Sequence, residues 1–301
     1  MKILVTGGAG FIASHVTDEL IAEGHQVAVV DNLSTGKSEN LNEHAAFYHV
    51  DISDQQLEDV FEQFQPEVVI HHAAQIDVKF SMQDPIRDSN INIIGSLQVL
   101  ELSRKYNVRK IIYASSAAVY GAPEFLGITE LHPIKPQSCY GISKHTFEHY
   151  LEVYSQLYGL DYTILRYANV YGLRQDPKGE GGVISIFIDK LLARKNPFIH
   201  GDGEQTRDFI YVKDVVQANL CALTKGSRLA INIGTNTQTS INQLFSLLCD
   251  LSKINMEPVY QASRQGDIQH SRLDNNLAAK CLDWRPNYSL MDGLAETFQT
   301  N

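Results

Sequence analysis

The chain has 301 residues, 44% of them hydrophobic, and a formal net charge of −10. This composition is ordinary for a globular protein, and the excess of acid argues against a general nucleic-acid binder, which needs a basic face to neutralise phosphates. The four cysteines show no metal, redox or disulfide spacing. Since there is also no apolar run of membrane-spanning length and no leader pattern at the start, we expect a cytoplasmic protein.

Strand and helix signals alternate through the first half of the chain. Short apolar, β-branched runs predict strands, and apolar residues at helical spacing predict helices. Strands are predicted at residues 3–6, 26–31, 47–50, 68–71, 110–115 and 161–166, and helices at 11–22, 90–106 and 140–158. This alternation indicates βαβ units with right-handed crossovers, so we expect an α/β fold with a doubly wound parallel sheet of the Rossmann type.

Beyond residue 171 the alternation is less regular. The pattern predicts loops at 173–182 and 202–207, a helix at 183–194, strand-like segments at 210–219 and 231–235, and a small irregular α/β lobe at 241–301. We therefore expect a Rossmann-type domain over 1–171, with returning segments near 205–240, and a smaller lobe built mainly from 172–301.

A glycine-rich turn joins the first predicted strand to the first helix. Gly7, Gly10 and Ala13 have the spacing Gly-x-x-Gly-x-x-Ala, which lets the backbone approach a pyrophosphate at the helix N-terminus. Asp31 ends the second strand, where an acid binds the ribose 2′-hydroxyl of NAD and repels the 2′-phosphate of NADP. Asp51, at the end of the third strand, suits the adenine amino group. The pattern predicts an NAD site, and the alternative is an ordinary strand–helix turn.

The spacing Tyr-x-x-x-Lys occurs twice, at Tyr106/Lys110 and at Tyr140/Lys144. In a helix it places both side chains on one face, where the ammonium lowers the pKa of the phenol and allows it to act as a base. The first copy straddles a turn before a strand. The second opens a long helix and follows a strand end that carries Ser116, and ligands bind at such strand ends in parallel sheets. We therefore assign catalysis to Ser116, Tyr140 and Lys144.

A metal-like pattern falls inside the same predicted helix. His145, Glu148 and His149 spell H-x-x-E-H, and the two histidines are one helical turn apart, as in some zinc sites. Because the motif begins directly after Lys144, we interpret these histidines as surface or packing residues and predict no metal site.

Eight segments together resemble the extended short-chain dehydrogenase/reductase family, and within it the UDP-glucose (UDP-galactose) 4-epimerase branch. They run in order from residue 1 to about 286: TGGAGFIASH, DNLSTG, HHAAQ, SSAAVYG, YGISK, RYANVYG, GDGEQTRDFIYVKDV and RQGDI.

The resemblance implies ligand-binding residues across both halves of the chain. It implies that NAD is surrounded by Phe11, Ile12, Asp31, Asn32, Leu33, Ser34, Thr35, Gly36, Asp51, Ile52, Ala73, Ala74, Gln75 and Asn92, with Tyr140, Lys144, Tyr167 and Ala168 at the nicotinamide half. It implies that the UDP-sugar contacts Asn169, Val183, Phe187, Phe198, His200, Arg207, Arg264 and Asp267. The two arginines would hold the diphosphate, for which the forked guanidinium is well suited.

The resemblance also implies a redox-neutral reaction at C4 of the sugar. Tyr140 as phenolate would take the proton of the 4-hydroxyl while hydride leaves C4 for the nicotinamide. Ser116 would hydrogen-bond the same oxygen, and Lys144 would hold the nicotinamide ribose and keep Tyr140 acidic. The 4-keto sugar would then turn over and accept the hydride on its other face.

Departures from related enzymes sharpen this expectation. Related 4,6-dehydratases carry an Asp-Glu pair after the Ser/Thr, and related UDP-glucuronate decarboxylases carry a Glu before Val-Tyr-Gly, whereas this chain has Ala117 and Ala118. Ser271 stands where a larger side chain limits the space beside the sugar's C2 substituent. Its small size predicts that N-acetylated UDP-sugars also fit.

Two alternatives remain open at the level of sequence. One is another nucleotide-sugar enzyme of this family, either a UDP-uronate 4-epimerase or a 4-keto-sugar reductase. The other is a non-catalytic NAD sensor or scaffold, which the presence of the whole Ser-Tyr-Lys set disfavours. The resemblance further suggests a homodimer that pairs through residues 92–106 and 140–158.

Overall fold

The computed structural model describes residues 1–178, 182–263 and 268–299. Seven parallel strands form the central sheet, in the order β11-β6-β5-β4-β1-β2-β3. They are β1 (Lys2–Thr6), β2 (Gln26–Asp31), β3 (Ala46–His49), β4 (Val68–His71), β5 (Lys110–Ser116), β6 (Asp161–Tyr167) and β11 (Leu229–Ile233). The expected doubly wound parallel sheet is confirmed.

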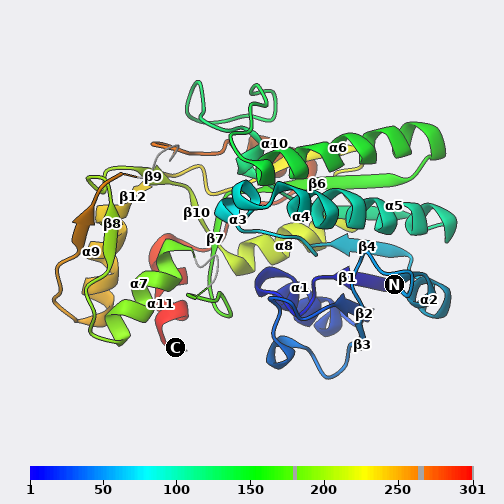
Figure 1. The fold of residues 1–301 in the computed structure, drawn as a ribbon, viewed down its shortest axis with the longest axis horizontal. Coiled ribbons are helices and arrows are strands. Elements are labelled where there is room, and N and C mark those ends of the chain that lie inside the picture. The colour runs from blue at the N-terminus through cyan, green and yellow to red at the C-terminus, as the bar shows by residue number, and fades with distance from the viewer. Residues whose placement is uncertain (179–181, 264–267, 300–301) are drawn as a thin grey trace.

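Helices cover both faces of this sheet (Figure 1). On one face lie α2 (Leu57–Phe64), α5 (Ser96–Lys105) and α6 (Cys139–Tyr158), and on the other lie α1 (Phe11–Ala22), α8 (Val212–Ala222) and α10 (Asn276–Cys281). Strand β1 shows how the sequence divides the core. Ile3 and Val5 pack with α1 and α8, while Leu4 between them packs with α2 and α5. Side chains that alternate in a strand and are apolar on both faces require two covering layers.

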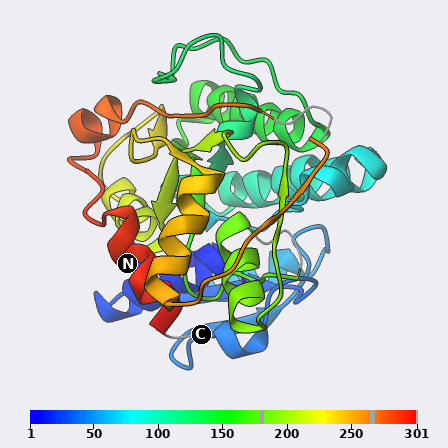
Figure 2. The ribbon, with the colours of Figure 1, turned by 90° about the vertical axis from the view of Figure 1, so that its left-hand side faces the viewer.

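A second layer system forms the smaller lobe, seen face-on in Figure 2. Its core lies between α7 (Val183–Leu192), α9 (Ile241–Ser252) and α11 (Leu290–Gln299). Short strand pairs complete it: β10 (Phe209–Tyr211) with β7 (Asn169–Tyr171), β12 (Thr239–Ser240) with β9 (Thr206–Arg207), and β13 (Val259–Gln261) with β8 (Phe198–His200).

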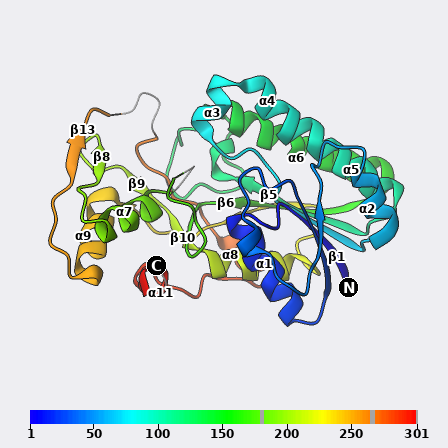
Figure 3. The ribbon, with the colours of Figure 1, turned by 60° about the horizontal axis from the view of Figure 1, so that its bottom comes forward.

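The lobe lies at the carboxyl edge of the sheet (Figure 3). Because all seven strands are parallel, their carboxyl ends share one edge, and β6 leads through Ala168 directly into β7. Two short helices, α3 (Val78–Gln83) and α4 (Pro85–Ser89), follow β4 at this edge, and both pack against α6. The part of the chain that the structure describes also contains three 3₁₀ or π segments, η1 (Ser38–Asn40), η2 (Asn90–Gly95) and η3 (Ala117–Val119).

Two predicted elements differ from the structure. The segment 210–219 was predicted to be strand-like, but only β10 is a strand and α8 begins at Val212. Its buried residues Val212, Val215, Val216 and Asn219 follow the helical spacing, which the β-branched composition obscured. The helix predicted over 90–106 is divided into the π-helical η2 and the α-helix α5. No helix among the described residues has the length and apolarity that a membrane span would need.

Candidate active site

The glycine-rich turn between β1 and α1 brings three chain segments together. Gly7 has φ +72°, and a Cβ atom there would lie 2.7 Å from the backbone nitrogen of Ala73 at the end of β4. Gly10 is the N-cap of α1 and carries no side-chain cap. The first N–H groups of α1 therefore point out of the helix without a capping side chain from Gly10. Such uncapped N–H groups can bind the pyrophosphate that the sequence pattern predicts at this turn.

Asp31 is fixed at the end of β2 by the glycine turn itself. One carboxylate oxygen accepts the backbone N–H of Ala9 at 3.0 Å, and the other accepts that of Leu33 at 2.8 Å. A Cβ atom on Gly36 would lie 3.0 Å from both oxygens, so the neighbouring loop also approaches closely. A carboxylate can accept about four hydrogen bonds. Capacity therefore remains for the ribose hydroxyls that the sequence assigns to Asp31.

Asp51 is held in a similar way just after β3. It accepts hydrogen bonds from Asn32 Nδ2 at 2.6 Å, the Ser53 backbone at 2.8 Å and Ser53 Oγ at 2.6 Å. Burial alone raises the pKa of this carboxyl, but the bonds from Ser53 and Asn32 outweigh it, and the pKa lies below its usual value. Of the other residues assigned to NAD, Asn32, Leu33, Ser34, Thr35 and Gly36 follow β2 directly, and Ile52 follows Asp51.

Tyr140 and Lys144 lie on the first turns of α6, beside the end of β5. Ser138 caps the helix by accepting the N–H of Gly141 at 3.1 Å, and the N–H of Tyr140 donates to Ser81 Oγ at 3.1 Å. Lys144 Nζ donates to the carbonyl of Ala114 at 3.0 Å and lies 5.9 Å from the centre of the Tyr140 ring. The sequence-predicted pair therefore forms one cluster on a single helix face.

Two opposing effects set the pKa of Lys144. Its side chain is almost fully buried, and burial lowers its pKa to about 8, although the carboxylates of Asp88 and Glu148 act in the opposite direction. At neutral pH Lys144 therefore stays protonated. An ammonium so close to Tyr140 favours the phenolate form of the tyrosine.

Ser116 completes the cluster at the last position of β5. Its Oγ accepts the N–H of Ala118 at 3.2 Å and caps the 3₁₀ segment η3, which fixes the hydroxyl oxygen at the strand end. The helix comes very close to this turn, since a Cβ atom on Gly141 would lie 2.6 Å from the carbonyl oxygen of Ala118. The positions of acid in related dehydratases and decarboxylases are occupied here by methyl groups.

The other Tyr-x-x-x-Lys copy is divided between two elements, as predicted. Tyr106 is the C-cap of α5 and donates to Glu58, whereas Lys110 begins β5 and lies 3.5 Å from Asp161.

Gln75 and Asn92 form a closed pair at the end of β4. The N–H of Gln75 donates to Asn92 Oδ1 at 2.8 Å, and Asn92 Nδ2 donates to the carbonyl of Gln75 at 3.0 Å. Beside them His72 contacts the hydroxyl of Tyr167 at 3.2 Å, while its buried Nδ1 has no hydrogen-bond partner among the described residues. Buried polar atoms usually have a hydrogen-bond partner, so a ligand bound at the carboxyl end of β4 could supply the partner of His72 Nδ1.

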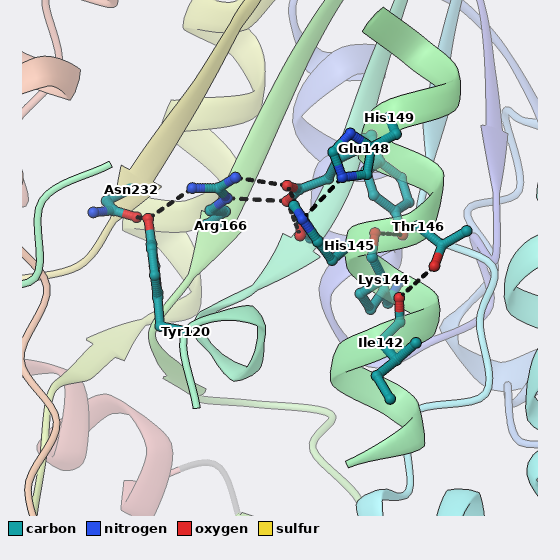
Figure 4. Close-up of polar contacts among 11 residues, drawn as sticks. Tyr120, Ile142, Lys144, His145, Thr146, Glu148, His149, Arg166 and Asn232 are labelled. Carbon is teal, nitrogen blue, oxygen red and sulfur yellow. Dashed lines mark hydrogen bonds and ion pairs between the residues drawn. The ribbon is translucent and has the colours of Figure 1, made fainter. Parts of the chain in front are cut away.

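A buried ionic network, which the sequence pattern did not reveal, lies one helical turn beyond Lys144 on α6 (Figure 4). Arg166 of β6 makes two hydrogen bonds to Glu148 of α6, at 3.0 and 2.6 Å, and a third to the hydroxyl of Tyr120 at 2.9 Å. Ser115, the neighbour of Ser116, donates to Glu148 at 2.6 Å. Burial raises the pKa of Glu148, but the hydrogen bonds from His145, Arg166 and Ser115 have a larger opposite effect and lower the pKa to about 2.

The histidines of the H-x-x-E-H pattern belong to this network. His145 Nδ1 lies 3.0 Å from Glu148, and its Nε2 lies 3.0 Å from Nε2 of the exposed His149. Since Glu148 is already bound by Arg166, its carboxylate serves an ion pair of the protein core. Within the described ranges no group of three metal-type ligands comes together.

The residues assigned to the sugar nucleotide come from the lobe and its borders. Asn169 begins β7, Val183 begins α7, and Phe198 and His200 lie on β8. Arg207 lies on β9, where its Nη1 donates to the carbonyl of Thr206 at 2.9 Å, and the backbone of Ser271 donates to the same carbonyl at 3.2 Å. Phe187 differs from the rest, because it is 1% exposed and packs edge-on against Phe245 in the lobe's core. Arg264 and Asp267 lie outside the described residues.

The fold and the glycine-rich turn define a dinucleotide-binding enzyme of the Rossmann class. The chain belongs to the NAD dependent epimerase/dehydratase family, which it matches over residues 3–234. The expected cofactor, NAD, is confirmed by this membership.

Several relatives have similar sequences and structures. A UDP-glucose 4-epimerase of Thermotoga maritima, solved with UDP-glucose, is 50% identical with a TM-score of 0.98 and covers 99% of this chain and 98% of its own. The UDP-glucose 4-epimerase of Mycolicibacterium smegmatis is 42% identical over 99% of this chain and 98% of its own. A UDP-N-acetylglucosamine 4-epimerase from Methanobrevibacter ruminantium is 36% identical, with a TM-score of 0.95 and coverage of 99% and 97%. The UDP-glucuronate 4-epimerase of Thermodesulfobacterium geofontis is 34% identical, with coverage of 98% and 94%.

Proposed function

We propose that this protein interconverts the C4 epimers of a UDP-hexose, with NAD as a bound catalyst. The observation that carries the proposal is the Tyr140–Lys144 pair on α6, which packs against the turn that Ser116 begins at the carboxyl end of β5. Ala117 and Ala118 stand in that turn, where elimination or decarboxylation would need an acid. The UDP-glucose 4-epimerases at 50% and 42% identity support the same assignment.

The residues divide the work of moving one proton. Tyr140, as phenolate, accepts the proton of the sugar's 4-hydroxyl and later returns it, which is general base and then general acid catalysis. Ser116 donates a hydrogen bond to the same oxygen. Lys144 provides the positive charge that holds the phenolate form and binds the nicotinamide ribose. NAD, when bound, supplies the reversible hydride acceptor for C4.

In this proposal the larger domain binds NAD and the smaller lobe binds most of the UDP-sugar. We assign the NAD-binding domain to 1–171 with returning segments near 205–240, and the UDP-sugar lobe mainly to 172–301. The strand β11 (Leu229–Ile233), which joins the main sheet beside β6, supports the returning segments. Arg207 and Arg264 would hold the diphosphate, and Asp267 the uridine ribose. The four free cysteines are consistent with a reducing, cytoplasmic location.

The direct test is incubation of the purified holoenzyme with UDP-glucose, UDP-galactose, UDP-N-acetylglucosamine and UDP-glucuronate, followed by separation of the C4 epimers. We expect interconversion of UDP-glucose and UDP-galactose without net accumulation of NADH absorbance. Turnover of UDP-glucuronate alone would favour the alternative activity, which the relative at 34% identity supports. Stoichiometric NADH formation would instead identify a dehydrogenase and refute the proposal.

We propose further that N-acetylated UDP-sugars are substrates. Ser271 has a small side chain and lies in the described segment that begins at residue 268. Its backbone N–H donates to the carbonyl of Thr206 on β9. The UDP-N-acetylglucosamine 4-epimerase at 36% identity supports this broader range. The Ser271→Tyr variant should lose turnover of UDP-N-acetylglucosamine and retain that of UDP-glucose. Failure of the wild type to convert the acetylated pair would contradict the proposal.

We also propose that two copies assemble through η2, α5 and α6. An apolar stripe of α6 is exposed, with Tyr150, Val153 and Leu157 at helical spacing, and Ile94 of η2 is 55% exposed. These elements are adjacent, since Arg104 of α5 lies over the Tyr158 ring at 5.1 Å. Such a stripe is typical of a surface that a second copy covers.

A further inference from the structure

A buried carboxylate lies beside the catalytic helix and has no part in the proposed proton transfer. Asp88 of α4 is fully buried, and α4 packs against α6. Its Oδ1 accepts hydrogen bonds from Gln75 Nε2 at 2.8 Å and from Asn92 Nδ2 at 3.2 Å. Its Oδ2 is buried and has no hydrogen-bond partner among the described residues. A carboxylate in this position is costly unless a positive charge lies near it.

Hydrogen bonds connect Asp88 to the turn of α6 that carries the chemistry. Asn92 Nδ2 also donates to Ser143 Oγ at 3.1 Å, and Ser143 Oγ donates to the carbonyl of Tyr140 at 3.0 Å. Ser143 is the immediate neighbour of Lys144. The Asn92 amide and the Ser143 hydroxyl therefore link Asp88 to the backbone carbonyl of Tyr140, one helical turn before Lys144.

The charges that face Lys144 leave Asp88 as its main counter-charge. On α6 itself Glu148 is already bound by Arg166 and His145. At the end of β4, burial lowers the pKa of His72 to about 3 and that of His71 well below its usual value, so both are neutral at neutral pH.

Two tyrosine rings also lie near Lys144. The centre of the Tyr113 ring on β5 is 5.0 Å from Nζ, and the centre of the Tyr140 ring on α6 is 5.9 Å from Nζ. Burial raises the pKa of Tyr113 well above its usual value, so its hydroxyl stays neutral. Of the carboxylates that raise the pKa of Lys144, Asp88 contributes more than Glu148.

We propose that Asp88 is a positioning residue of this active site, whose buried negative charge keeps Lys144 protonated while Asn92 and Ser143 transmit its position to α6. This inference rests on the proposed function for its catalytic meaning. The nicotinamide ring of NAD is itself a cation, and a second positive charge next to Lys144 favours loss of the lysine proton. A counter-charge from a separate element allows the ammonium and the oxidised cofactor to be present together.

The direct test measures the protonation of Lys144 in the NAD-bound holoenzyme. Lysine side chains labelled with ¹⁵N are titrated by NMR, and the Lys144→Met variant assigns the signal. Asp88→Asn keeps the shape and an acceptor oxygen but removes the charge, so the midpoint of Lys144 should fall by about one pH unit. Asp59→Asn removes the same charge from an exposed position on α2 and should leave the midpoint unchanged.

A second charge-removing variant, Asp88→Ser, is measured in parallel in case one replacement prevents folding. A Lys144 midpoint that stays at its wild-type value in the folded variant overturns the proposal. The alkaline limb of kcat for C4 epimerisation should move to lower pH together with the NMR midpoint. If the wild type does not epimerise any UDP-sugar, the proposed function fails, and the NMR titration still decides the role of Asp88.

Discussion

The phenolic oxygen of Tyr140 is the single atom that the proposed reaction needs for the O4 proton. Tyr140→Phe removes this oxygen and keeps the ring. The backbone N–H of residue 140, which donates to Ser81 Oγ, is unaffected. We expect kcat for UDP-glucose epimerisation to fall about a hundredfold to ten-thousandfold, the usual contribution of a positioned general base. The NAD content, measured after denaturation of the purified protein, should stay close to that of the wild type. Full activity in this variant would refute the assignment of Tyr140.

Asp31 makes a second sharp test, because both of its oxygens already accept backbone N–H groups. In Asp31→Asn one of these oxygens becomes an NH₂ group that faces a donor, either Ala9 or Leu33. We expect the dissociation constant for NAD to rise by about tenfold or more, since the ribose hydroxyls lose a charged acceptor and hydrogen bonds to charged groups contribute about 1.5–3 kcal/mol. Calorimetric titration with NAD and NADP measures it. Preference for NAD should decrease, and an unchanged ratio of the two affinities would contradict the role of Asp31.

The residues that could be predicted from the sequence are those whose role follows from position along one element. Asp31 ends a strand next to a glycine turn. Tyr140 and Lys144 share one helix face, and their place after the strand end at Ser116 distinguishes them from the other copy of the same spacing. Asp88 and Glu148 could not be found in this way. Glu148 on helix α6 obtains its role from Arg166, eighteen residues away on strand β6. The environment of a buried carboxylate depends on which segments the fold brings around it.

At the scale of elements, the Glu148–Arg166 pair joins α6 to β6 behind the active site. Glu148→Gln leaves the buried Arg166 without a carboxylate, and we expect the free energy of unfolding to fall by about 3–5 kcal/mol. Urea denaturation at neutral pH measures this. Replacement of both residues, Glu148→Leu with Arg166→Met, removes the unpaired charge and should recover part of the loss. A single variant as stable as the wild type would contradict this account.

The pH dependence of the same pair has a definite sign. The pKa of Glu148 in the folded protein, about 2, lies below the ordinary value of 4.5. Its contribution to stability is therefore present above about pH 4.5 and lost as the pH falls toward 2. Glu148→Gln should flatten this part of the acid denaturation curve. As a control, Glu58→Gln removes an exposed partner of Lys105 and should leave stability nearly unchanged, as is usual for surface pairs.

Elements were predictable where periodicity and composition agree, and ambiguous where they conflict. The strands β1, β2 and β4 and the helices α1 and α6 lie within a residue of their predicted bounds. The start of α8 is rich in β-branched valine, which favours strands, although its buried residues repeat at helical spacing. The π-helical turn of η2 could not be predicted from the apolar pattern. Asn92 in this turn bonds with Gln75 and Ser143, and such tertiary contacts leave no periodic signal in the sequence.

At the scale of the whole molecule, the doubly wound parallel sheet could be predicted from the alternation of strands and helices, but the composition of the lobe could not. Its core joins α7, α9 and α11, which are far apart along the chain, and its strands have only two or three residues. Such short strands carry too few side chains for a period-two pattern, so only the tertiary structure identifies them.

Assembly is the remaining property of the whole molecule that the surface predicts. The exposed stripe on α6 combines Val153, which is 46% exposed, with Leu157, which is 67% exposed. If a second copy covers it about a twofold axis, each change acts twice in the interface. The double variant Val153→Glu with Leu157→Glu should shift the species measured by light scattering from twice the 33.7 kDa chain mass to a single chain. Leu192→Glu alters a similarly exposed leucine on α7 and should leave the dimer intact, whereas a monomeric wild type would contradict the interface.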